Sequence, residues 1–209
     1  MLVLSSPSGG GKTTIARALL AARGDVAYSI SATTRPPRPN EQDGVDYHFL
    51  SADQFQARVD AGDFLEWAEY GGYRYGTLAS VIEAIRASGK HAILDIEVVG
   101  ARKVRERLAN VVSIFIVPPS AGALFERLTL RQTEASDELG LRIQHAVEEV
   151  EAAVEYDYLV VNDDREQAVA EVNSIIEAEC LRTTRLDRLA PAMNELRQGL
   201  MDKAESLQK

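Results

Sequence analysis

A glycine-rich segment near the amino terminus constrains the fold more than any other part of the sequence. Residues 6–13 have the sequence SPSGGGKT and lie between an apolar run at residues 2–4 and a helical pattern at residues 12–23. The segment matches the phosphate-loop pattern GxxxxGKS/T except at its first position, where Ser6 replaces glycine. A strand, such a loop and a helix in this order predict an α/β fold in which backbone N–H groups surround an anion.

The residue types in this loop fit nucleotide phosphates and a metal ion. The lysine of such a loop, here Lys12, reaches the β- and γ-phosphates, and the hydroxyl of Thr13 is a ligand for Mg²⁺. The alternative is a glycine-rich turn with an incidental lysine, which the flanking strand and helix patterns disfavour. The residues predicted to bind ATP are Ser6, Pro7, Ser8, Gly9, Gly10, Gly11, Lys12, Thr13 and Thr14.

Short apolar runs alternate with helical patterns along the rest of the chain. The runs are rich in β-branched residues and lie at residues 2–4, 26–30, 92–96, 111–117 and 158–161. The helical patterns lie at residues 12–23, 78–88, 98–108, 120–131, 137–155 and 164–182. Strands that alternate with helices predict a mostly parallel sheet with helices on both faces, which together with the loop is the P-loop NTPase fold.

One segment departs from this alternation. Residues 32–76 are rich in proline, glycine and aromatic residues, and they contain the alternating stretch Asp46–Leu50. Ser51 and Gln54 form a capping-box pattern that predicts a short helix to about Ala61. We therefore expect a partly antiparallel α/β insertion at 32–76 within a core formed by residues 1–31 and 77–182.

Composition and charge exclude several classes of protein. The chain has 23 Lys plus Arg against 32 Asp plus Glu, so its net charge of −9 disfavours binding to a nucleic-acid backbone. A single cysteine excludes an internal disulfide, and the three histidines lack short-range metal-ligand spacing. No apolar run approaches the roughly 20 residues that span a bilayer, and no signal-peptide pattern is present, so we expect a cytoplasmic protein without membrane partners.

Two arginines lie on a proline-rich loop after the second strand. Arg35 and Arg38 flank the dipeptide Pro36-Pro37, which limits the conformational freedom that the arginines lose on binding a ligand. Paired guanidinium groups suit a phosphate, and Tyr47 and Tyr75 can add hydroxyl donors. A solvated polyproline turn is the alternative for this loop taken alone.

The last segment has a different pattern. Leu186, Leu189, Met193, Leu196 and Leu200 are spaced 3, 4, 3 and 4 residues apart, which is a short heptad stripe. We expect a helical extension at residues 183–209 that packs against the core or forms a homo-oligomer. A disordered tail is the alternative, because isolated helices of this length are marginal in water.

Beyond the phosphate loop, the chain resembles the guanylate kinase family over about residues 2–182. The motifs that carry the resemblance occur in the family's order and spacing at residues 31–38, 43–49, 64–68, 75–77, 94–97, 118–120 and 156–164. The resemblance implies transfer of the γ-phosphoryl group of ATP to GMP, and to dGMP, within a core, a GMP-binding insertion at 32–76 and a helical lid at about 120–145.

The resemblance also implies roles for individual residues. The residues implied to bind GMP are Ser31, Arg35, Arg38, Tyr47, Glu66, Tyr75, Thr77, Asp95 and Glu97. The residues implied to be catalytic are Lys12, Asp95 and the lid arginines Arg131 and Arg142. Asn162 is expected at the adenine edge, with ordinary turn formation as the alternative. Leu130 and Gln132 flank Arg131 where the family more often has glycine, which suggests a stiffer lid.

Two other functions compete with this one. A catalytically inactive, guanylate-kinase-like phosphopeptide-binding module would have a degraded phosphate loop, whereas Lys12, Thr13 and Asp95 are all present here. A kinase for another nucleoside monophosphate is disfavoured by Glu66. A fixed carboxylate accepts hydrogen bonds from the adjacent N1–H and N2–H₂ groups of guanine, whereas adenine presents a lone pair at N1.

Overall fold

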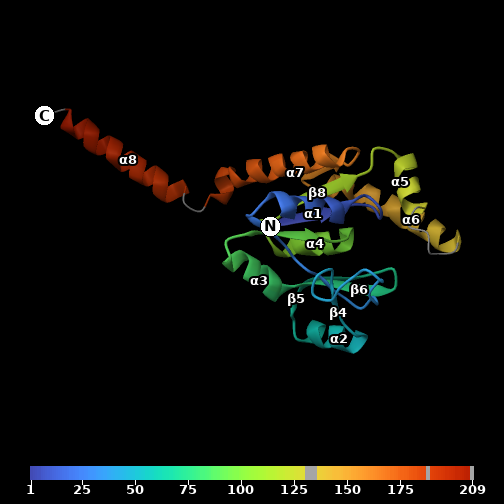
Figure 1. Ribbon diagram of the computed structural model, residues 1–209. Coiled ribbons are helices and arrows are strands. Elements are labelled where there is room, and N and C mark those ends of the chain that lie inside the picture. Colours follow the sequence, from blue (N-terminus) through green and yellow to red (C-terminus); the bar gives the residue numbers. More distant parts are fainter. Residues whose placement is uncertain (130–135, 187–188, 208–209) are drawn as a thin grey trace. The chain divides into compact units, whose positions relative to one another are not determined.

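The computed structural model describes residues 1–129, 136–186 and 189–207 (Figure 1). The chain forms two compact units, Met1–Val172 and Asn173–Lys209, which are described separately. No helix in these described ranges combines the length and hydropathy that a bilayer crossing requires.

Five parallel strands form the main sheet of the first unit, in the order β2-β7-β1-β8-β9. They are β1 (Leu2–Ser5), β2 (Val26–Tyr28), β7 (His91–Asp95), β8 (Val112–Val117) and β9 (Tyr158–Val161). All five match the predicted apolar runs. Because β1 is central and parallel to β7, the glycine-rich loop and Asp95 emerge at the same carboxyl edge of the sheet, where α/β proteins bind ligands.

Helices cover both faces of this sheet. Successive side chains of a strand point to opposite faces, so Val3 lies on the face opposite Leu2 and Leu4. Val3 packs with residues of α3 (Ala79–Ala87) and α4 (Val98–Arg107), whereas α1 (Lys12–Ala22) packs on the other side (Figure 1). The fold expected from the alternating pattern is confirmed.

The segment after β2 forms a second sheet with strand order β4-β3-β6-β5. Its strands are β3 (Ala32–Thr33), β4 (His48–Phe49), β5 (Phe64–Tyr70) and β6 (Tyr73–Leu78). Strand β3 is parallel to β4, and the other pairs are antiparallel. The predicted capping box at Ser51 and Gln54 begins α2 (Ala52–Asp60), whose Phe55 is fully buried in the core of this sheet.

The remaining elements of the first unit follow β8. Helices α5 (Ala121–Thr129) and α6 (Ser136–Glu151) lie in the region predicted to form the lid, and a 3₁₀ turn, η1 (Ala152–Glu155), continues α6. Residues 130–135, which include Leu130, Arg131 and Gln132, lie outside the described residues. Helix α7 (Arg165–Cys180) follows β9 and runs across the boundary between the two units.

The second unit is helical. It contains the end of α7, a 3₁₀ turn η2 (Thr183–Arg185) and α8 (Leu189–Ser206). The buried carboxylate of Glu179 pairs with Arg182 at 3.1 Å and with Arg185 at 2.8 Å, which ties the turn to the end of α7. Helical structure is therefore present where the heptad stripe predicted it, whereas a partner for the stripe stays a prediction.

Candidate active site

A cavity of about 850 Å³ lies where the glycine-rich loop, the end of β7 and the second sheet meet. Sixteen of the predicted site residues line it: Ser6, Pro7, Ser8, Gly9, Gly11, Lys12, Thr13, Thr14, Ser31, Arg35, Arg38, Tyr47, Glu66, Tyr75, Asp95 and Glu97. Gly10, Thr77, Arg142 and Asn162 are not part of its wall. Residues from two sheets that are far apart in sequence thus share one cavity.

The loop conformation explains two of its glycines. Gly9 has φ of +85° and Gly11 has φ of +100°, values that side-chain-bearing residues rarely adopt. A Cβ atom on Gly11 would also lie 2.2 Å from Nδ2 of Asn162. That amide donates a hydrogen bond of 2.9 Å to the carbonyl oxygen of Gly10, so Asn162 stabilises the loop conformation without lining the cavity. A contact of Asn162 with adenine stays a prediction.

Ser6 fits the loop without strain. No residue other than glycine has a positive φ in the described chain, so the first loop position does not need the left-handed backbone. The buried hydroxyl of Ser6 donates to the carbonyl oxygen of Pro7 at 3.0 Å. Gly10 packs directly on this side chain, since a Cβ atom there would lie 2.7 Å from Cβ of Ser6.

Lys12 lies among carboxylates at the end of β7. Its Nζ donates to Oε1 of Glu97 at 2.8 Å and lies 4.0 Å from Oδ1 of Asp95. Burial by itself lowers the pKa of Lys12, but Glu97 and Asp95 outweigh burial and raise the pKa above its ordinary value. Lys12 is therefore a fixed positive charge at the mouth of the loop.

Asp95 connects this charge to the loop threonine. Thr13 Oγ1 donates to Oδ2 of Asp95 at 2.6 Å, and the hydroxyl of Tyr28 lies 3.4 Å from the same oxygen. Burial raises the pKa of Asp95, while Lys12 and the Thr13 hydrogen bond oppose that rise. Tyr28 was not predicted to belong to the site, because a tyrosine in a strand is an ordinary core residue.

One further carboxyl group, which was not predicted from the sequence, lies against the glycine-rich loop. Glu149 on α6 is 7% exposed, and its Oε2 accepts a 3.0 Å hydrogen bond from the backbone N–H of Ser8. Its other oxygen, and Oε2 of Glu97, have no hydrogen-bond donor among the described residues. Burial and the neighbouring Glu97 raise the pKa of Glu149. The glycine-rich loop is therefore held by a buried carboxyl group from a helix that is distant in sequence.

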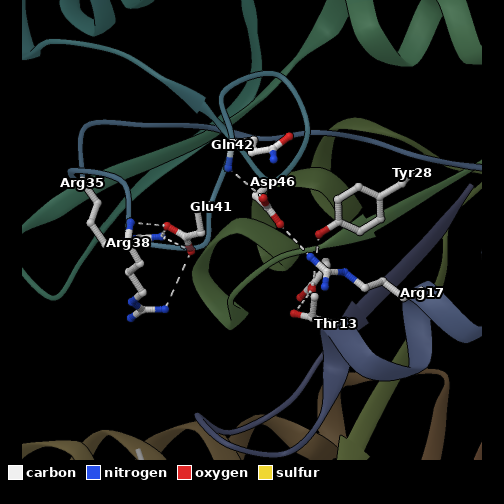
Figure 2. Close-up of polar contacts among 9 residues, drawn as sticks. Thr13, Arg17, Tyr28, Arg35, Arg38, Glu41, Gln42 and Asp46 are labelled. Carbon is white, nitrogen blue, oxygen red and sulfur yellow. Dashed lines mark hydrogen bonds and ion pairs between the residues drawn. The ribbon is translucent and has the colours of Figure 1, made fainter. Parts of the chain in front are cut away.

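The predicted arginine pair is assembled around a glutamate (Figure 2). Arg35 Nη2 donates to both carboxylate oxygens of Glu41, at 2.8 and 2.9 Å, and the backbone N–H of Arg38 donates to Oε2 at 2.8 Å. Burial by itself raises the pKa of Glu41, but these donors lower it below its ordinary value. Arg35 also lies over the ring of Tyr47, whose centroid is 6.0 Å from that of Tyr75. These four predicted residues thus form one cationic and hydroxyl-rich cluster.

An ion pair connects α1, the helix after the phosphate loop, to the segment between β3 and β4 of the second sheet. Arg17 of α1 donates to Oδ1 of Asp46 at 2.6 Å, and Asp46 accepts the backbone N–H of Gln42 at 3.0 Å (Figure 2). Both Arg17 and Asp46 line the cavity. The sequence did not predict this contact, because Arg17 reads as an ordinary basic residue on a helix surface and its partner Asp46 is 29 residues away.

A β-bulge orients Glu66. Along β5 and β6, Phe64 pairs with Leu78 whereas Glu66 pairs with Thr77, so Leu65 is the extra residue. Without the bulge, the period of two would place Glu66 on the same face as Phe64, which is buried against Phe55. With it, Glu66 faces the cavity and is 4% exposed.

The carboxylate of Glu66 is held by its strand partner. Thr77 Oγ1 donates to Oε1 of Glu66 at 2.7 Å. Burial raises the pKa of Glu66, and the hydrogen bonds from Thr77 oppose that rise. The cavity thus contains a buried carboxylate that can accept hydrogen bonds from a ligand.

Two arginines of α5 and α6, in the region predicted to form the lid, contact backbone carbonyl groups. Arg142 donates to the carbonyl oxygen of Leu128 at 3.4 Å, and Arg127 donates to that of Asn162 at 2.9 Å. Neither residue lines the cavity. A catalytic role for Arg142 stays a prediction, and Arg131 lies outside the described residues.

The chain is similar to known proteins over most of its length. The family model described as guanylate kinase matches residues 1–179. The guanylate kinase of Symbiobacterium thermophilum is 48% identical over 185 residues, which are 88% of this chain and 88% of that protein. The guanylate kinase of Alkalilimnicola ehrlichii is 44% identical over 201 residues, which are 96% of this chain and 98% of that one.

A solved structure shows the same arrangement of elements. The crystal structure of guanylate kinase from Anaplasma phagocytophilum superposes with a TM-score of 0.78 at 33% identity, and the match covers 93% of each chain. The phosphate loop, the arginine pair and the buried glutamate lie within residues 1–179, which the family model matches. On the sequence match, the shared fold and the assembled cavity, the chain belongs to the guanylate kinase family.

Proposed function

We propose that this protein transfers the γ-phosphoryl group of ATP to GMP, giving ADP and GDP. The observation that carries the proposal is that one cavity joins the phosphate loop to the arginine pair and to Glu66. A donor nucleotide on the loop and an acceptor phosphate at the arginines would therefore face each other. The names of the relatives support the same activity.

The residues supply positioning and charge rather than covalent chemistry. The attacking group is a phosphate oxygen of GMP, which is already an anion near neutral pH, so no general base is required. Lys12 and the loop N–H groups stabilise negative charge on the donor phosphates, while Arg35 and Arg38 orient the acceptor. Binding GMP phosphate requires that the arginines exchange Glu41 for the ligand or share it.

The guanine base is recognised by a carboxylate in this proposal. Glu66, fixed by Thr77, accepts hydrogen bonds from N1–H and N2–H₂ of guanine. Adenine would leave the buried carboxylate facing a lone pair, which costs about 1–3 kcal/mol or more. Ser31, Tyr47 and Tyr75 complete the acceptor site as proposed ligands of GMP.

The residues present fit a magnesium ion that accompanies ATP. Among the described residues no group of three metal-binding side chains exists. The Thr13 hydroxyl and the adjacent Asp95 carboxylate are hard oxygen groups of the kind that Mg²⁺ prefers, and Mg²⁺ commonly keeps nucleotide phosphates and water as further ligands. When bound, the ion would neutralise charge on the β- and γ-phosphates.

Three further parts of the proposal rest on the sequence. Arg131 and Arg142 would bring positive charge to the transferring group when the lid closes and excludes water. We also propose a cytoplasmic location, and assembly through residues 183–209 stays a prediction.

The linked positions of Lys12, Thr13 and Asp95 favour an active kinase over an inactive binding module.

A coupled assay of ADP formation tests the activity. Purified protein would be incubated with ATP and Mg²⁺ and, in separate reactions, with GMP, AMP, CMP or UMP. We expect turnover with GMP and at most slow turnover with the other three acceptors. ADP formation that does not depend on any acceptor, or that prefers AMP, would contradict the proposal.

A further inference from the structure

The strand that carries Glu66 lies at an edge of its sheet. Strand β5 is the last in the order β4-β3-β6-β5, so within the described part of the chain the backbone groups on its outer side have no partner strand. Two cations of α4 occupy this side. Lys103 Nζ donates to the carbonyl oxygen of Trp67 at 2.5 Å, and Arg107 donates to that of Leu65. These carbonyl groups belong to the residues immediately before and after Glu66.

The two contacts hold the bulge as well as the strand. Leu65 is the extra residue of the bulge that turns Glu66 toward the cavity. Bulges leave the extra residue without its normal ladder partner, so a donor from outside the sheet stabilises that conformation. Lys103 also lies 5.2 Å from the centre of the Trp67 ring, which adds a cation–π contact to the hydrogen bond.

Gly100, one turn before Lys103 on α4, leaves room for the carboxylate itself. A Cβ atom at this position would lie 2.8 Å from Oε2 and 3.2 Å from Cδ of Glu66. The helix therefore approaches Glu66 as closely as a residue without a side chain permits. Thr77 holds one carboxylate oxygen at 2.7 Å, and the Gly100 backbone faces the other.

We propose that Gly100, Lys103 and Arg107 are positioning residues for base recognition, because α4 fixes the direction in which the Glu66 carboxylate faces the base. The inference rests on the proposed function, in which Glu66 binds guanine. It assigns the choice between guanine and adenine to a helix of the core as well as to the second sheet.

The substitution Gly100→Ala should disturb base recognition while leaving the fold intact. Alanine favours a helix more than glycine does, so the backbone of α4 tolerates the change. The clash is with the end of the Glu66 side chain and not with backbone, and the simplest relief is that the Glu66 carboxylate moves away. Movement of that group removes hydrogen bonds to a charged acceptor, each of which contributes a factor of roughly 10 or more to binding.

The first experiment measures Gly100→Ala with GMP and with AMP as acceptors. We expect KM for GMP to rise about 10-fold or more and the preference for GMP over AMP, as a ratio of kcat/KM, to fall by a similar factor. KM for ATP and the melting temperature should stay close to the wild-type values. Unchanged KM for GMP together with unchanged selectivity would overturn the assignment of Gly100.

The second experiment compares charge removals on the same helix. Lys103→Met should raise KM for GMP and weaken selectivity, because the Trp67 carbonyl loses its donor. Arg105→Met is the matched control, since Arg105 lies over the ring of Tyr156 and not against β5. Lys103→Arg should restore most of the selectivity, because arginine can also donate to a carbonyl oxygen. Equal effects of Lys103→Met and Arg105→Met on selectivity would overturn the proposal for Lys103.

Measurements on the wild-type protein distinguish failure of the proposed function from failure of the role assigned to α4. Absence of acceptor-dependent turnover with GMP in the wild type would reject the proposed function itself. A wild type that selects GMP, with Gly100→Ala and Lys103→Met that select it equally well, would reject only the role of α4. If Lys103→Met melts at a much lower temperature, calorimetric titration of GMP into Gly100→Ala still decides, since that variant keeps the helix.

Discussion

Replacing Glu149 with glutamine should stabilise the nucleotide-free protein above neutral pH. The carboxyl group accepts the N–H of Ser8 and is surrounded by Glu97, Lys12 and the hydroxyl of Tyr70. Burial and Glu97 raise its pKa from an ordinary 4.5 to about 7. Glutamine has nearly the same shape, can accept the same N–H and can donate to the carboxylate of Glu97.

Proton linkage gives the direction and the magnitude of the change in stability with pH. Because the folded pKa is higher than the unfolded one, the stability from this group is complete below pH 4.5 and is lost as pH rises through about 7. Each unit of pKa difference corresponds to about 1.4 kcal/mol, so the wild type loses about 3 kcal/mol over this window. In a protein of this size that corresponds to a melting-temperature difference of roughly 6–12 °C.

The assay is thermal unfolding without nucleotide at pH 5 and at pH 8. The variant and the wild type should melt at similar temperatures at pH 5, and the variant should melt higher at pH 8. Glu148→Gln, an exposed change on the same helix, is the control and should show no such divergence. A difference that is independent of pH, or a variant that is less stable at pH 8, would refute the reasoning.

Two substitutions and one deletion test the roles of the phosphate loop and of the C-terminal helix. Lys12→Ala should lower turnover by about 10²–10³-fold while calorimetry shows that GMP still binds, and near-normal turnover would contradict the role of the loop. Ser6→Gly should leave KM for ATP nearly unchanged and reduce the unfolding free energy by about 1 kcal/mol, since Ser6 is unstrained and fills space under Gly10; a large rise in KM would mean that its hydroxyl contacts ATP. Deletion from Thr184 should change the melting temperature or the assembly state seen by light scattering, and no change in either would reject packing by the heptad stripe.

Local signals in the sequence were sufficient for most of the fold. Buried parallel strands are short and continuously apolar, and the helices between them are amphipathic, so all five strands of the main sheet could be located. The phosphate loop and the arginine loop are also local patterns. The phosphate loop follows β1 of the main sheet and the arginine loop follows β3 of the second sheet, so their meeting in one cavity depends on how the two sheets pack against each other.

Other features depend on contacts that no local pattern encodes. Glu149 is 141 residues from Ser8, and a glutamate on an amphipathic helix is ordinarily a solvated residue. The bulge at Leu65 depends on register between β5 and β6, which the alternation of apolar residues does not specify. Glu41 lies in a loop of charged and turn-forming residues, and its ion pair with Arg35 required the folded loop.

The most direct test of base recognition by this site is the selectivity of Glu66→Ala. The measurement is the ratio of kcat/KM for GMP to that for AMP, in the variant and in the wild type, with KM for ATP as the internal control. We expect that the variant loses GMP activity mainly through KM, that the ratio falls by at least about 10-fold, and that KM for ATP is unchanged. A variant that keeps the wild-type preference for GMP would show that guanine is recognised elsewhere and would contradict the central claim.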